Sequence, residues 1–214
     1  MKITIKNTAR LAGLLYLIVI VGGIFAELMV RGKLVVAGDP AGTARNITTH
    51  ENLYRWGFAV EVFYCLLNVP LMLIFYKLFK VVNLRLSQLV VLFSLIGTAV
   101  EAISLLFHFA PLILLANKPY LSAFSTAELQ GWSYLSLRFF EYGFCISLVF
   151  FGGYCLVMGR LIYRSGFLPK FIGVLLGFQG FCYLINSFAN FLSPALAAQF
   201  FPVLELAGLG EVFK

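Results

Sequence analysis

YLSLRFFEYGFCISLVFFGG, residues 134–153, is a run of 20 residues that is apolar enough to cross a lipid bilayer. A helix of about 20 residues spans the hydrocarbon core of about 30 Å, and the absence of water there requires backbone hydrogen bonds within the segment. The run nevertheless contains Arg138 and Glu141, two charges that are costly in lipid. Because they lie three residues apart, they share a helix face, and we expect an ion pair between them.

The composition of the whole chain indicates an integral membrane protein whose main partner is the lipid bilayer. Of 214 residues, 61% are hydrophobic and only 12% are charged. A soluble domain carries about 25% charged residues. The 16 Lys and Arg outnumber the nine Asp and Glu, but they lie at the ends of apolar runs and form no patch interleaved with aromatic residues. We therefore predict no nucleic-acid partner.

The apolar runs predict an all-α fold, a polytopic bundle of six transmembrane helices that forms a single domain over residues 1–214. Basic residues gather before the first run, between the second and third, and between the fourth and fifth. The positive-inside rule then places the N-terminus in the cytoplasm. The expected spans are 9–31, 53–79, 86–116, 132–160, 168–192 and 199–214.

The two ends of the chain and an internal repeat add further expectations. The basic start and apolar run of the first span also fit a signal peptide, but the run continues through Glu27, which favours a retained helix. The last run covers only about 25 Å as a helix, so we expect a chain truncated at its C-terminus. In the first and third spans Gly stands four residues before Glu, at Gly23 with Glu27 and at Gly97 with Glu101. This pattern suggests a pseudo-repeat of three helical hairpins.

Six of the nine acidic residues fall inside the expected spans. Helical spacing places them on faces that also carry small and polar residues, and such faces are expected to point into a bundle. Most of these polar residues belong to the outer half of the spans, which predicts a polar pocket open to the outer side. The expected ligand-binding residues are Glu61, Glu101, Arg138, Glu141, Glu205, His108, Asn68 and Asn186.

A metal site is left open, and no cofactor and no catalytic residue are predicted. Glu101 and His108 lie seven residues apart, about 10.5 Å along a helix, so they do not chelate one ion directly. The other histidine, His50, falls in an outer loop. We expect the protein to bind or translocate a small polar or cationic solute. The alternatives are a membrane-embedded enzyme, metal-assisted or not, that acts on a lipid or small molecule, and a structural or regulatory subunit. Each is compatible with a homo-oligomer.

Four stretches of the chain resemble a family of bacterial membrane proteins. They are ARLAGLLYLIVIVGGIFAE (9–27), LYRWGFAVEVFYCLLNVPLMLIFYKLFK (53–80), FSLIGTAVEAISLL (93–106) and ELAGLGEVF (205–213). Together they are similar to domain of unknown function 4386. The resemblance implies a multi-pass protein of the bacterial inner membrane with six helices, and it implies no activity.

Overall fold

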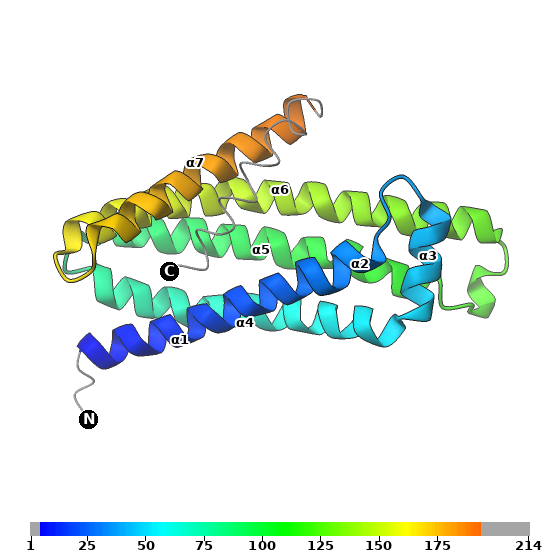
Figure 1. The fold of residues 1–214 in the computed structure, drawn as a ribbon, viewed down its shortest axis with the longest axis horizontal. Helices are drawn as coiled ribbons and strands as arrows, with labels where there is room; N and C mark the ends of the chain where they lie inside the picture. Colours follow the sequence, from blue (N-terminus) through cyan, green and yellow to red (C-terminus); the bar gives the residue numbers. More distant parts are fainter. Residues whose placement is uncertain (1–4, 194–214) are drawn as a thin grey trace. The chain divides into compact units, whose positions relative to one another are not determined.

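The computed structural model describes residues 5–193, which form helices joined by short loops (Figure 1). Helix α1, Ile5–Ile24, continues through a π-helical segment, Phe25–Arg31, into the short helix α2, Gly32–Leu34. Helix α3, Pro40–Thr49, follows, and a 3₁₀ turn, Pro119–Leu121, precedes α6. The long helices are α4 at Glu51–Phe79, α5 at Leu84–Leu114, α6 at Thr126–Ser165 and α7 at Lys170–Leu192.

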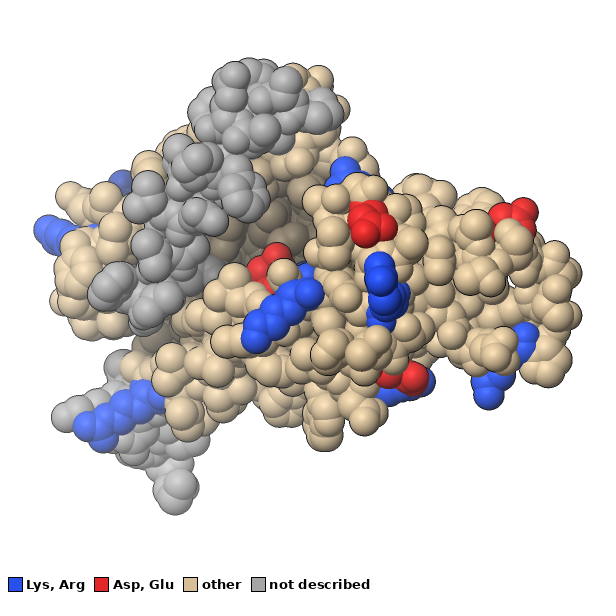
Figure 2. Space-filling model, turned by 45° about the vertical axis from the view of Figure 1, so that its right-hand side comes forward, with Lys and Arg blue, Asp and Glu red and all other residues tan. Residues whose placement is uncertain are grey.

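Five of these helical stretches are long and apolar enough to cross a membrane, and the first of them joins α1, the π-helical segment and α2 as Thr8–Leu34. They correspond to the first five expected spans. The sixth, 199–214, lies outside the described residues. Many large apolar side chains on the long helices are exposed. On the face drawn in Figure 2, most of the surface is uncharged and the charged side chains form small separate groups. These features fit a surface in contact with lipid.

Helix α6 begins earlier than the expected span of 132–160. The backbone N–H of Ser125 donates to the Glu128 carboxylate at 2.7 Å, and the Glu128 N–H donates to the Ser125 hydroxyl at 3.3 Å. This reciprocal capping box satisfies backbone donors at a helix start. It starts α6 at Thr126, and the 40 residues of α6 extend about 60 Å, twice the thickness of the hydrocarbon core.

The chain divides into two compact units, and the division falls within the long helices. The first unit comprises Met1–Ile20, Leu66–Val100 and Cys145–Lys214. The second comprises Val21–Cys65 and Glu101–Phe144. Each unit therefore takes one part of α4, of α5 and of α6, while α7 belongs to the first unit and α3 to the second.

The first unit has an apolar core and a close contact between α6 and α7. Its buried core side chains include Leu71, Phe79, Val90, Met158 and Leu161. A Cβ added at Gly159 of α6 would meet the Gly173 carbonyl oxygen of α7, and one added at Gly180 would come within 2.7 Å of the Gly152 carbonyl oxygen. Glycines thus let the two backbones touch, the type of helix packing that is common in membranes.

The second unit has a smaller apolar core that joins the segment after α1 to α3, α4, α5 and α6. Its α3 helix is capped by Asp39, whose carboxylate accepts from the Gly42 N–H at 2.8 Å, with Pro40 at the first helical position. Such a cap fixes where a helix begins. The buried core side chains are Val30, Leu34, Ile47, Tyr54, Leu112 and Leu137.

Candidate functional site

Four ionisable side chains of the second unit lie together, and we call them the ion cluster: Glu27, Arg31, Glu61 and His108. Glu27 and Arg31 come from the π-helical segment, Glu61 from α4 and His108 from α5. The side chain of Glu61 is 0% exposed and that of His108 is 1% exposed. The side chain of Arg31 is 13% exposed, whereas that of Glu27 is 59% exposed. The cluster therefore runs from a fully buried carboxylate to one at the surface.

Arg31 holds the ion cluster together through both carboxylates. Its Nε donates to Glu27 Oε2 at 2.9 Å, and its terminal nitrogens donate to Glu27 and to Glu61 Oε1. The second Glu61 oxygen, Oε2, lies 2.5 Å from His108 Nδ1. Glu61 thus lies between a guanidinium and an imidazole, and both of its oxygens have a partner.

Glycines explain how the helices approach closely enough to form the cluster. The Gly32 N–H bonds the Glu27 carbonyl oxygen, five residues earlier, and a Cβ at Gly32 would lie 3.2 Å from that oxygen. A side chain there would crowd the π-helical segment. On α4, a Cβ at Gly57 would lie 2.8 Å from the methyl groups of Val30. The absence of that Cβ lets α4 place Glu61 beside Arg31. π-Helical segments are rare and frequently lie at functional sites.

Aromatic rings enclose the guanidinium and the imidazole. The Arg31 guanidinium carbon lies 5.0 Å from the centre of the Phe140 ring, within the range of a cation–π interaction. The imidazole of His108 stacks on the same Phe140 ring, and the two ring centroids lie 4.8 Å apart. The buried Tyr54 hydroxyl donates to the His108 carbonyl oxygen at 2.6 Å. These contacts fix the positions of the guanidinium and of the imidazole.

One nitrogen of the cluster stays without a partner. His108 Nε2 is buried and makes no hydrogen bond to the described residues. Since Nδ1 faces the Glu61 carboxylate, the neutral imidazole carries its proton on Nδ1 and leaves a lone pair on Nε2. A second proton at Nε2 would make His108 a cation.

The ion cluster combines two carboxyl groups, Glu27 and Glu61, with one guanidinium, Arg31, and one imidazole, His108. A further carboxylate, Glu101, is 4% exposed and accepts a hydrogen bond from the Tyr64 hydroxyl at 2.7 Å. The second unit therefore holds two buried carboxyl groups, Glu61 and Glu101.

A family model described as Domain of unknown function (DUF4386) matches residues 11–213. The chain belongs to the DUF4386 family. This confirms the resemblance expected from the sequence, over nearly the whole chain. Comparisons with curated proteins and with solved structures give no match.

The DUF4386 chain brings together only part of the residue set predicted from its sequence. Glu61 and His108 are in direct contact. Arg138 and Glu141 form the ion pair expected from their spacing, and both side chains are 46% exposed. Glu141 lies close enough to Glu27 and Arg31 to interact with their charges. Asn68 and Asn186 belong to the first unit. Asn186 Oδ1 accepts from the Asn190 side chain at 2.9 Å. Glu205 lies outside the described residues.

Sequence reasoning did not include Arg31 among the candidates, although Arg31 is the centre of the ion cluster. Arg31 follows the first apolar run, so the sequence pattern assigns it to the loop that comes after that run. One signal was present in the sequence, since Glu27 precedes Arg31 by four residues, the spacing and order that favour an ion pair on a helix. Within residues 5–193, no group of three or more His, Cys, Asp or Glu is placed to hold a metal ion.

Neutralising Glu61 is expected to destabilise the protein strongly. In Glu61→Gln the buried Arg31 loses one of its two carboxylates, and breaking a buried ion pair costs about 3–5 kcal/mol. The free energy of unfolding, measured with denaturant on the full chain in detergent micelles, should fall by that amount.

Glu51→Gln is the matched control because Glu51 is on the same helix and also pairs with an arginine, Arg55, but both side chains are about half exposed. An exposed pair contributes about 1 kcal/mol or less. Equal losses in the two variants would contradict a special role for the buried cluster.

Proposed function

We propose that this protein binds a small cationic solute at the ion cluster and carries it across the membrane. The observation that supports this is the position of the Arg31 guanidinium, held by Glu27 and Glu61 and covered by the Phe140 ring. Carboxylates and aromatic faces are the groups with which proteins recognise organic cations. Arg31 then occupies the site as a cation of the chain itself, and the solute displaces it.

Glu27 provides the entry to this site. Its side chain is more than half exposed, whereas Glu61 is fully buried, and Arg31 bridges the two. An arriving cation meets Glu27 first and competes there with Arg31. The π-helical segment that carries both residues is the irregular part of the first membrane-crossing stretch, where a local change of hydrogen bonding moves Arg31 without unfolding α1.

The solute has to replace the counter-charge that Arg31 gives to Glu61. If Arg31 leaves Glu61, a buried carboxylate loses its main counter-charge, which costs several kcal/mol. A cationic solute that takes the place of the guanidinium restores this charge. His108 holds the other Glu61 oxygen through Nδ1, so the carboxylate stays in position during the exchange.

The two alternative functions make different predictions for the same residues. A structural or regulatory subunit would use the cluster only to hold helices together, and the near-complete burial of Glu61 and His108 is compatible with that. A membrane-embedded enzyme would need catalytic groups around the cluster, and no observation favours it. A transport measurement distinguishes a structural or regulatory subunit from the proposed carrier of a cation.

The proposed topology has six spans, an N-terminus in the cytoplasm and the bacterial inner membrane as its location. Basic residues at the ends of α4, α5, α6 and α7 support it: Lys77, Lys80, Arg85, Arg160, Arg164 and Lys170. Measured along the helix, Glu61 lies 16 residues from Lys77 and His108 lies 23 residues from Arg85, which is about 24 Å and about 35 Å. The cluster then belongs near the outer border of the hydrocarbon core.

Cysteine labelling tests this topology. In a chain whose native cysteines are replaced, Ser122→Cys in the loop before α6 should react with a membrane-impermeant maleimide added to intact cells. Asn83→Cys in the turn between α4 and α5 should react only after the cells are opened. Both positions are exposed, so neither result reflects burial. The opposite pattern would show that the orientation is wrong.

Transport of guanidinium tests the proposed function. Guanidinium is the head group that the site already holds, so liposomes containing the full chain should take up radiolabelled guanidinium several-fold faster than protein-free liposomes down an imposed guanidinium gradient. Glu61→Gln and Glu27→Gln should reduce the initial rate to near the protein-free level.

Glu27→Gln guards against a folding defect, because Glu27 is exposed, and Glu51→Gln should keep the wild-type rate. If wild-type protein gives the protein-free rate while Glu61→Gln still loses stability, the structural alternative is favoured. Wild-type rates in both cluster variants would also contradict the proposal.

A further inference from the structure

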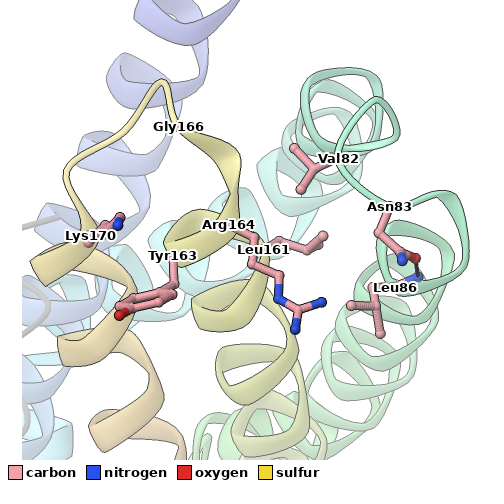
Figure 3. Close-up of a pocket in the computed structure, with 8 residues that line it drawn as sticks. All are labelled: Val82, Asn83, Leu86, Leu161, Tyr163, Arg164, Gly166 and Lys170. Atoms are coloured by element: carbon pink, nitrogen blue, oxygen red, sulfur yellow. Dashed lines mark hydrogen bonds between the residues drawn. The ribbon is translucent and has the colours of Figure 1, made fainter.

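A cavity of about 580 Å³ opens in the first unit, at the C-terminal end of α6 (Figure 3). Val82 and Asn83, before α5, and Leu86 line one side of it, and Leu161 and Arg164 of α6 face them. Tyr163, on the other side of α6 in this view, also contributes to the lining. Figure 3 shows the Arg164 side chain extending into the space between α6 and the start of α5. Lys170, the first residue of α7, also lines the cavity.

The two cations of the cavity have no acidic partner among residues 5–193. Residues 1–26, 62–100 and 142–204 contain no Asp or Glu. The described part of the first unit therefore contains basic residues and no carboxylate, and Arg164 forms no ion pair there. Lys170 Nζ lies 5.5 Å from the centre of the Tyr163 ring, which orients the ammonium without neutralising it. Arg164 and Lys170 thus line one cavity where the described residues supply no carboxylate, and this favours an anion there.

The start of α7 adds to the positive character of the cavity. Pro169 precedes the helix and offers no side-chain cap, so the first backbone N–H groups of this 23-residue helix are not satisfied by a side chain. Such N–H groups and the helix dipole favour a negative charge. Asn83 Oδ1 accepts a hydrogen bond from the Leu86 N–H at 2.9 Å, so the side-chain amide nitrogen of Asn83 is available as a donor.

The apolar part of the lining indicates what kind of anion fits. Val82, Leu86 and Leu161 share the cavity with the cations. Next to it, Phe167 and Phe171 expose 42% and 60% of their surface. A site with cations at one end and apolar surface beside it matches a phosphate group that carries hydrocarbon chains. Basic pockets between transmembrane helices bind anionic lipid headgroups in this way.

We infer that this cavity binds a phosphate ester, with Arg164 and Lys170 as the charged contacts and Asn83 as a donor. The headgroup of an anionic phospholipid and a soluble phosphate compound share this chemistry. Arg164 is suited to the phosphate because its planar guanidinium can donate two parallel hydrogen bonds. The inference does not depend on the function proposed for the ion cluster.

Native mass spectrometry of the full chain released from detergent micelles tests the inference. Dioleoyl phosphatidylglycerol should bind with at least fivefold higher apparent affinity than dioleoyl phosphatidylcholine, because only the former carries a net negative charge. The double variant Arg164→Gln/Lys170→Gln should lose this difference. The double variant Arg164→Lys/Lys170→Arg keeps both charges and should retain most of it.

The matched control is Arg45→Gln/Lys118→Gln, which removes two exposed basic residues of the second unit and should bind like the wild type. Equal affinity for the two lipids in the wild type, or an equal loss in the control, would overturn the inference. Competition by inorganic phosphate at millimolar concentration would support the site and assign it to a soluble phosphate compound. Phosphatidylglycerol binding that phosphate does not displace would assign it to the lipid.

Discussion

A guanidinium group buried between helices needs counter-charges beside it, and the second unit is arranged around that need. Arg31 pairs with Glu27 and Glu61, and Glu61 in turn contacts His108. Gly57 gives α4 the close approach that brings Glu61 to Arg31, and the π-helical segment carries Glu27 and Arg31 to the same place. Without Glu61, the guanidinium would be a buried charge with incomplete compensation, one of the most destabilising defects in a protein interior.

The two units differ in the charged residues that they contain. All Asp and Glu residues that the structure describes belong to the second unit. The charged residues in the described part of the first unit are all basic. A cation-binding cluster and an anion-binding cavity are the natural uses of these two environments.

The sequence predicts the helices better than it predicts their faces. Long apolar runs give five membrane-crossing helices because no other structure satisfies the backbone in lipid. The contact between Glu61 and His108 follows from polar stripes on two helices. Arg138 and Glu141 form the ion pair that their spacing predicts, and both side chains are about half exposed. Periodicity alone does not predict that exposure, because lipid and bundle interior are both apolar. Arg31 was missed because the first helix continues beyond its apolar run, through a π-helical segment that the sequence pattern does not predict.

Chemical rescue of Arg31→Ala tests most directly whether Arg31 occupies a cation site. Millimolar guanidinium chloride, far below denaturing concentrations, should raise the midpoint of thermal unfolding of Arg31→Ala, because the free ion fills the place between Glu27 and Glu61. It should not raise that of the double variant Arg31→Ala/Glu61→Gln, nor that of Arg55→Ala, where the lost arginine pairs with Glu51 at the surface. No rise in Arg31→Ala, or an equal rise in all three variants, would contradict the account.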